Sequence, residues 1–217
     1  LIHGKLNDDA LQDVLKSSIL QAIYREAQRS GQPIYCIVDD TIASHTRPSS
    51  QAVHPIEAAY FHQSHLKGCQ DYGHQVVSVM LSCNGITLNY AVILYDKSRS
   101  KIQIVQEIAE ELPAAPVISN FLCDSWYTTA KVMDRFIRKG FYTVGALKTN
   151  RILYPCGIRQ KASAFALHLR KTDPDVSLVT VGSREFYVYR YEGELNGSPN
   201  EAVILSYTKD GFGSPKA

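Results

Sequence analysis

The arrangement of apolar and polar positions predicts that helices and strands alternate along the first two thirds of the chain. Apolar side chains recur at helical spacing from Leu11 to Ile23, behind Asn7 or Asp8 as a cap. Asn84–Gly85 favours a tight type I′ hairpin, because both central residues of that turn need a positive φ. The predicted elements in chain order are a helix that ends near Gly31, strands at 34–39, 75–81 and 86–95, a helix from Ser100 to Pro113, a strand at 117–123, a helix at 128–139 and a strand at 141–147.

This order of elements predicts an α/β protein with a ribonuclease H-like fold. A strand, a hairpin and two helix–strand units give a mixed five-stranded sheet, in which three strands are antiparallel and two are added in parallel, with flanking helices. The first and fourth strands then lie side by side and run parallel. The polar segment 41–74 is longer than an ordinary connection. We therefore expect it to be functional, or to be partly helical across 56–64.

After Arg151 the pattern changes to that of an antiparallel β region. A short helix is predicted at 161–170, and three tyrosines alternate so that they share one face of a strand. The strand-like runs are 176–181, 186–191 and 202–207, and the tyrosines are Tyr187, Tyr189 and Tyr191. We expect three segments: an N-terminal helical segment at 1–33, an incomplete catalytic core at 34–151 and a β-rich insertion at 152–217.

The composition is that of an ordinary globular protein. Of 217 residues, 45% are hydrophobic and 20% are charged, and the net charge is +2, so no strongly basic character marks a nucleic-acid partner. No apolar run reaches the roughly 18 residues of a membrane span, and no signal peptide opens the chain. Five cysteines without a CxxC pair indicate a reducing, cytoplasmic setting. The start without methionine and the loop-like composition of 211–217 lead us to expect a piece of a longer protein.

Two acidic positions follow strands that should be neighbours. Asp39 and Asp40 come directly after the strand at 34–38, and Asp124 ends the run at 117–123. Because the carboxyl ends of parallel strands meet at one edge of a sheet, we expect Asp40 and Asp124 to lie close together. Two carboxylates suit Mg²⁺ and two-metal phosphodiester chemistry. Asp39 points to the opposite face from Asp40. The alternative for Asp124 is a turn or a cap of the following helix.

Other polar and aromatic positions have two interpretations each. His62, His65, Cys69 and His74 have gaps that suit tetrahedral zinc, but they lack a CxxC pair, and a helix at 56–64 would splay them, so we prefer a polar segment. Trp126 and Tyr127 either stack on a base or pack the start of the following helix, and we prefer packing.

Four segments together resemble the DDE transposases of bacterial insertion sequences. They are Val38–Asp39–Asp40–Thr41, Gly73–His74–Gln75, Cys123–Asp124–Ser125–Trp126–Tyr127 and Gly145–Ala146–Leu147–Lys148–Thr149–Asn150–Arg151. The resemblance covers nearly the whole chain. It implies a ribonuclease H-like catalytic domain with three metal-binding acids and, in the cut-and-paste branch, a β-rich insertion before the third acid.

The resemblance assigns the first acid to Asp40, because the family's acid is directly followed by threonine, and the second to Asp124. The third should be a glutamate on a helix within a Tyr-Arg-Glu-Lys-type motif, which this sequence lacks. We therefore expect it beyond residue 217, so that this chain alone is inactive. The family often has a lysine where His45 stands, so the family's role for that lysine does not carry over to His45.

The resemblance also implies the reaction and the partners. The function would be cleavage and joining of phosphodiester bonds at transposon ends, with Mg²⁺ or Mn²⁺, on double-stranded DNA, by a homodimer in the bacterial cytoplasm near the nucleoid. Lys148, Arg151 and Arg47 are candidates for contacts with DNA phosphates, and a solvated surface is the alternative for each. Two other functions stay open: a ribonuclease H-like nuclease that does not transpose, and a non-catalytic, domesticated DNA-binding module.

Overall fold

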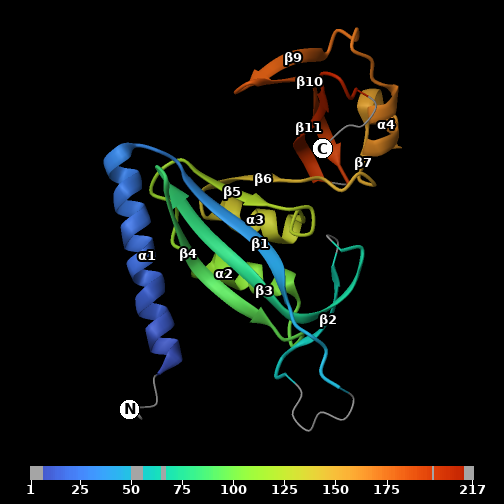
Figure 1. Cartoon of the computed structure of the whole chain (residues 1–217). Coiled ribbons are helices and arrows are strands. Elements are labelled where there is room, and N and C mark those ends of the chain that lie inside the picture. The colour runs from blue at the N-terminus through green and yellow to red at the C-terminus, as the bar shows by residue number, and fades with distance from the viewer. Residues whose placement is uncertain (1–6, 50–55, 65–66, 197, 213–217) are drawn as a thin grey trace. The chain divides into compact units, whose positions relative to one another are not determined.

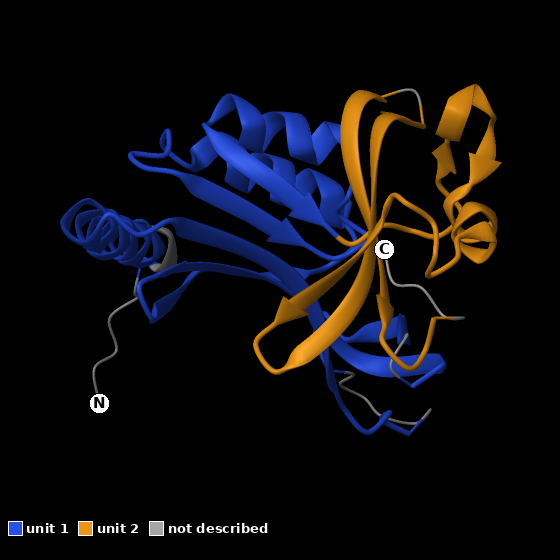
Figure 2. Cartoon of the chain, turned by 90° about the horizontal axis from the view of Figure 1, so that it is seen from above, with its two compact units in different colours: residues 1–145 blue, residues 146–217 orange. Residues whose placement is uncertain are grey.

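The computed structural model describes residues 7–49, 56–64, 67–196 and 198–212. The chain forms two compact units, Leu1–Gly145 and Ala146–Ala217, which Figure 2 draws in different colours. Each unit has its own cluster of buried apolar side chains. The segment boundaries that the sequence suggested at 33/34 and 151/152 stay predictions.

The first unit is built on one mixed sheet (Figure 1). Its strands are β1 (Ile34–Ser44), β2 (Tyr60–Ser64), β3 (Cys69–Cys83), β4 (Ile86–Tyr95), β5 (Ser119–Cys123) and β6 (Phe141–Gly145). The order is β2-β3-β1-β5-β6, and β4 pairs with β3 as well. β3 is antiparallel to β1 and β4, whereas β1, β5 and β6 run parallel. The predicted ribonuclease H-like sheet is confirmed, including the parallel pairing of the first and fourth predicted strands.

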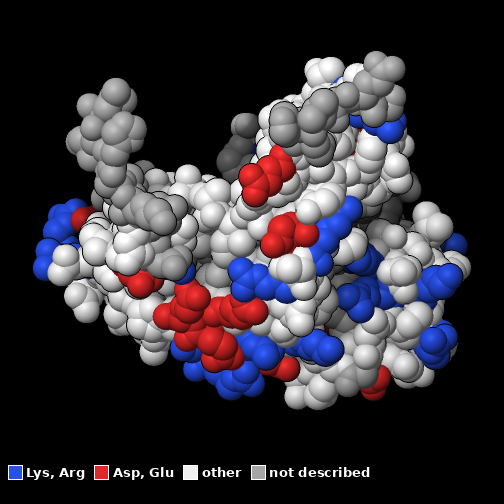
Figure 3. Space-filling view, turned by 90° about the horizontal axis from the view of Figure 1, so that it is seen from below, with Lys and Arg blue, Asp and Glu red and all other residues white. Residues whose placement is uncertain are grey.

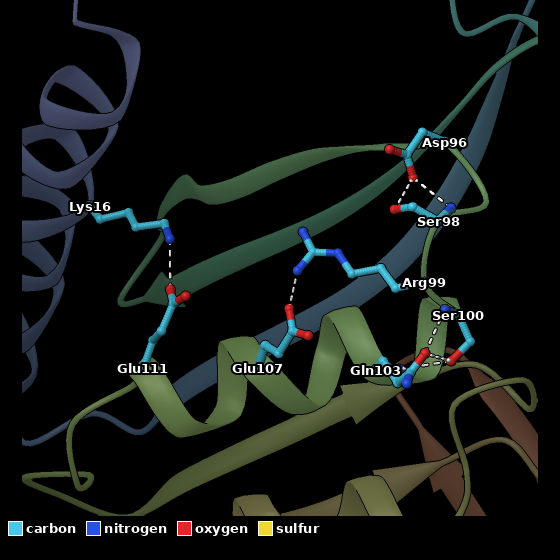
Figure 4. A network of polar contacts seen from close by, with 8 residues as sticks. All are labelled: Lys16, Asp96, Ser98, Arg99, Ser100, Gln103, Glu107 and Glu111. Carbon is cyan, nitrogen blue, oxygen red and sulfur yellow. Dashed lines mark hydrogen bonds and ion pairs between the residues drawn. The ribbon is translucent and has the colours of Figure 1, made fainter.

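Three helices accompany this sheet, and their ends follow the local sequence. They are α1 (Asp8–Ser30), α2 (Lys101–Glu111) and α3 (Ala130–Arg138). The side chain of Asn7 caps α1 by accepting from the Ala10 amide at 3.2 Å. Ser100 and Gln103 form a reciprocal capping box at the start of α2 (Figure 4). Asn84 and Gly85 have φ values of 48° and 82°, so the predicted type I′ turn is confirmed.

The core of the first unit lies on one face of the sheet. Along β3, every second residue from Gly73 to Cys83 is buried, whereas the residues between them are only partly buried. Ile104 and Ile108 of α2 join the same core, and the ring of Phe136 on α3 stacks on that of Phe121 at 3.7 Å. The alternately buried residues of the strands and the apolar side of α2 therefore pack together in one layer.

The helix proposed at 56–64 is wrong, because residues 60–64 form strand β2. β2 pairs antiparallel with the first third of β3, with His62 opposite Asp71. β4 pairs with β3 only from Gln75 onward, so β2 provides hydrogen-bond partners for the earlier part of β3. His62 and Ser64 are buried whereas Phe61 and Gln63 are exposed, which is the alternation of a strand. β2 adds a sixth strand to the five that the sequence predicted.

The second unit is an antiparallel β structure, as predicted for this region. Its elements are β7 (Ile152–Leu153), a 3₁₀ turn (Pro155–Gly157), β8 (Gln160–Lys161), α4 (Ala162–His168), β9 (Val176–Val181), β10 (Arg184–Leu195) and β11 (Ser198–Thr208). The strand order is β11-β10-β7-β8, with β9 paired to β10. Tyr187, Tyr189 and Tyr191 pack on or within the apolar cluster of this unit, so they line a packed sheet face.

All five cysteines are free thiols. Within the described part of the chain, no helix is both long enough and apolar enough to span a bilayer.

Candidate functional site

Strand β1 carries Asp40 to the rim of the core face. Ile34, Cys36 and Val38 are buried on that face, and Asp40 is the next residue in the same alternation. Its side chain is only 14% exposed. Asp39 is exposed, and its Oδ1 accepts a hydrogen bond from the Asp40 amide at 2.8 Å. The two neighbouring acids therefore have different surroundings, and Asp40 is the one enclosed by protein.

Both carboxylate oxygens of Asp40 accept hydrogen bonds from side chains of other elements. Oδ2 accepts from Nε2 of Gln75 on β3 at 2.5 Å and from Nζ of Lys101 at 2.9 Å. Oδ1 accepts from the hydroxyl of Tyr127 at 2.9 Å. Donors to the charged form favour the carboxylate, and they fix its orientation at the end of the core.

Asp124 leaves the sheet beside β1. β1 and β5 run parallel, and the last paired positions are Val38 and Cys123, so the chain segments carrying Asp40 and Asp124 emerge at the same edge. Oδ1 of Asp124 accepts from the amides of Trp126 at 2.9 Å and Tyr127 at 3.4 Å. These two hydrogen bonds close a turn after β5, which is the alternative role that we considered for Asp124.

Tyr127 links the two acids. Its amide donates to Asp124 and its hydroxyl to Asp40, so one tyrosine spans the space between the two carboxylates. The side chain is fully buried. Burial, followed by the negative charge of Asp40, raises the pKa of Tyr127, which keeps the hydroxyl protonated as a donor. The packing interpretation therefore holds for Tyr127, because a buried ring is not available to stack on a base.

Two glycines allow close approach of chain segments near these acids. A Cβ atom on Gly73 would lie 2.1 Å from the carbonyl oxygen of Ala43 on β1. A Cβ atom on Gly145 would lie 2.3 Å from Oγ1 of Thr128, in the segment that follows Asp124. Real Cβ atoms do not come this close to other atoms. The close atom at Gly73 is backbone, so the pairing of β1 with β3 requires glycine there, whereas at Gly145 the side chain of Thr128 would have to move.

The donor set fits a hard divalent cation in part. Two carboxylates at one sheet edge suit Mg²⁺, which keeps several waters and takes one or two protein carboxylates. Among the described residues, no group of three or more His, Cys, Asp or Glu side chains is placed to hold a metal. Asp40 and Asp124 stay the predicted ligands of such an ion.

No three described members of the alternative zinc set form a metal-binding group. His62 is 6% exposed and its ring lies beside that of Tyr95, with centroids 6.1 Å apart. Nδ1 of His74 lies 2.8 Å from Nε2 of His45, and its Nε2 lies 2.8 Å from the carbonyl oxygen of Glu57. His65 lies outside the described residues. Of the two described histidines of the set, His62 thus packs against a ring and His74 makes hydrogen bonds.

The three basic candidates lie in different parts of the chain. Arg47 follows β1, and its guanidinium lies 5.3 Å from the ring centroid of Phe61. Lys148 and Arg151 belong to the second unit, where the Arg151 amide donates to the Lys148 carbonyl at 3.0 Å and closes a turn. Lys148 is exposed and Arg151 is partly exposed.

The sheet order and the acids at its edge place the protein among the ribonuclease H-like α/β proteins with a carboxylate site at the ends of adjacent parallel strands. The family model described as "Transposase DDE domain" matches residues 30–180, which is more than half of the chain. The chain belongs to this family of transposase DDE domains. No curated protein matches it.

Sequence reasoning missed the role of two residues at this site, Gln75 and Lys101. Gln75 was part of a segment on which the resemblance rested, but no contact followed from that. Lys101 is the first residue of α2, behind the Ser100 cap. A lysine at this point opposes the helix dipole, and that conflict was the one local signal that could have identified it.

Proposed function

We propose that Asp40 and Asp124 are catalytic carboxylates of a transposase that cleaves and joins DNA strands at the ends of a mobile element. The observation that carries the proposal is the pair of acids at the ends of adjacent parallel strands, joined through Tyr127, in a chain of the transposase DDE family. Mg²⁺ or Mn²⁺ is the cofactor, since oxygen ligands of this kind suit hard cations.

The chain's own residues prepare the site for this chemistry. Asp40 and Asp124 would hold the metal, Tyr127 fixes their separation, and Gln75 orients Oδ2 of Asp40. In the two-metal chemistry proposed for this site, one bound ion would activate the attacking oxygen and the other would stabilise the leaving oxygen of the phosphodiester. Burial raises the pKa of Cys123 to about 11, which disfavours the thiolate that a nucleophile would need.

Double-stranded DNA is the proposed substrate, and Arg47, Lys148 and Arg151 are proposed to contact its phosphates. These contacts position the duplex and carry no sequence information by themselves. The face drawn in Figure 3 carries Lys and Arg side chains next to Asp and Glu side chains, in keeping with the small net charge of +2. We propose further that the full-length protein acts as a homodimer that bridges two DNA ends.

The test is strand cleavage by the full-length protein with Mg²⁺ and DNA that carries the element's ends. We expect Asp40→Asn and Asp124→Asn each to lower the rate by about a thousandfold, which corresponds to about 4 kcal/mol of lost transition-state stabilisation. Asp39→Asn is the matched control, because Asp39 is exposed and lies next to Asp40. Activity retained in either of the first two variants, with folding confirmed by circular dichroism, would exclude this site.

The products of the same reaction separate the proposed function from its alternatives. A transposase transfers the freed 3′ end to a target DNA, so joined products appear. Cleavage without joined products supports a nuclease that does not transpose. DNA binding without cleavage, at several Mg²⁺ and Mn²⁺ concentrations, supports a non-catalytic module.

A further inference from the structure

Lys101 lies at the start of a helix, where a positive charge is unfavourable. It is the first residue of α2, directly after the Ser100 cap, and no acidic residue lies in the first turn of the helix. The N-terminus of a helix carries a partial positive charge, so a cation there is disfavoured. The Lys101 side chain is also only 13% exposed, which removes most of its hydration. Such a conflict between local preference and structure is typical of functional sites.

Two contacts offset this cost. Nζ of Lys101 lies 2.9 Å from Oδ2 of Asp40 and 4.8 Å from the ring centroid of Trp126. The ammonium therefore lies between the first acid and the indole of the segment that follows Asp124. It supplies a positive charge at the edge of the sheet where the two carboxylates emerge.

A divalent cation and the Lys101 ammonium compete for the same oxygen. A carboxylate oxygen that already accepts from Gln75 and Lys101 has little room for a third close partner. Two cations a few ångströms apart in a poorly hydrated site repel each other strongly. Lys101 has a flexible four-carbon stem and is able to move away, whereas Gln75 is held on the central strand β3.

We propose that Lys101 is an exchangeable counter-ion of Asp40, which orients this carboxylate and gives way when a divalent cation binds. The inference rests on the proposed function, because it assumes that Asp40 is a metal ligand. It makes Lys101 a positioning residue whose charge lowers the affinity of the site for metal while it stabilises the folded chain.

The experiment is a titration of this 217-residue chain with Mn²⁺ alone, followed by the electron paramagnetic resonance of free Mn²⁺. We expect Lys101→Met to bind Mn²⁺ roughly tenfold more tightly than the wild type, because the competing charge is gone. Lys101→Arg keeps the charge and should bind like the wild type. Lys97→Met is the matched control: Lys97 is exposed and its ammonium lies 4.9 Å from the ring centroid of Tyr60.

Thermal melting gives a second reading that does not depend on the spectroscopy. Without metal, Lys101→Met should melt at a lower temperature than the wild type, since Asp40 loses its counter-ion. At the same high Mn²⁺ concentration, the melting temperature should rise more in Lys101→Met than in the wild type, because stabilisation of the folded state by a ligand grows with the logarithm of its affinity. Lys97 donates to the carbonyl oxygen of Phe61 at 3.3 Å, so Lys97→Met is compared by its rise in melting temperature with Mn²⁺, which should equal that of the wild type.

Asp40→Asn separates failure of this inference from failure of the proposed function. If Mn²⁺ binding depends on Asp40 but Lys101→Met binds equally or more weakly than the wild type, the counter-ion role is wrong and the metal site stands. If Asp40→Asn binds like the wild type, or if neither the wild type nor Lys101→Met binds, the metal site itself is wrong, and the counter-ion role falls with it.

Discussion

Tyr127 binds Asp124 through its backbone amide and Asp40 through its hydroxyl, so the hydroxyl can be removed without disturbing the turn around Asp124. Tyr127→Phe deletes the donor to Oδ1 of Asp40 and keeps the fully buried ring. We expect the free energy of unfolding to fall by about 1.5 kcal/mol, the range for a hydrogen bond to a charged group. Urea denaturation at neutral pH measures it.

The control for this change is Tyr142→Phe. The Tyr142 side chain is 67% exposed on β6 of the same unit, so loss of its hydroxyl should leave the stability nearly unchanged. An equal effect of the two substitutions would show that the hydrogen bond to Asp40 contributes nothing to stability.

His62 makes the stability of the chain depend on pH. Burial, followed by the positive charge of Lys97, lowers the pKa of His62, and its Nε2 has no hydrogen-bond partner among the described residues. The folded chain therefore binds fewer protons at this position than the unfolded chain. The stabilisation is present above the unfolded pKa of about 6.5 and is lost as the pH falls through the lowered folded pKa.

We expect His62→Phe to reduce the loss of stability between pH 7 and pH 5, because the phenyl ring fits the aromatic surroundings and does not titrate. Denaturant unfolding at several pH values measures the slope. The control is His168→Gln, at an exposed position of α4, which should keep the slope of the wild type. A slope unchanged in His62→Phe would show that other groups cause the acid sensitivity.

At the scale of single residues, the sequence indicated the two acids but not the residues that hydrogen-bond to them. Asp40 and Asp124 stood out because each follows an apolar run, and strand ends carry such sites. The conflict of Lys101 with the helix dipole marks the residue but not its partner, and the contact of Tyr127 depends on where a turn approaches β1, which no local pattern encodes. These contacts join residues 61 and 87 positions apart in the sequence.

At the scale of elements, the pairing of β1 with β3 depends on Gly73. A Cβ atom there would lie 2.1 Å from the carbonyl oxygen of Ala43, and the backbone on both sides is held by strand pairing. We expect Gly73→Ala to lower the free energy of unfolding by about 3 kcal/mol, at the upper end of overpacking effects, because β1 must shift. Denaturant unfolding followed by circular dichroism tests this.

Ser78→Ala, in the same strand, is the control. Ser78 is partly exposed, and an alanine there introduces no new atom, so its effect should stay below about 0.5 kcal/mol. If Gly73→Ala is as stable as Ser78→Ala, β1 and β3 do not need their close approach.

The elements with a strong apolar period were predicted well, and those without it were not. α2, α3 and the central strands follow helical or alternating patterns, whereas α1 was marked by its Asn7 cap although Leu11, Val14 and Leu15 of its apolar series are exposed. β2 was missed because its buried positions, His62 and Ser64, are polar, so its alternation is invisible in a hydrophobicity pattern. The short strands β7 and β8 have two residues each, which is too few for any period to show.

At the scale of the whole molecule, the two units have separate cores. We expect residues 1–145 to fold when expressed alone, because the sheet and its three helices share one apolar cluster that contains no residue of the second unit. A cooperative thermal transition and a dispersed amide NMR spectrum would be the signs of folding. A spectrum typical of an unfolded chain would show that the second unit is required.

Iron-mediated cleavage of the protein backbone shows directly whether Asp40 and Asp124 hold one metal site. Fe²⁺ in place of Mg²⁺, with ascorbate and peroxide, produces radicals that cut the chain next to the bound ion. We expect cuts near both residue 40 and residue 124 of the wild type, and their loss in Asp40→Asn and Asp124→Asn. Cuts elsewhere, or cuts at these two positions that persist in both variants, would contradict this expectation.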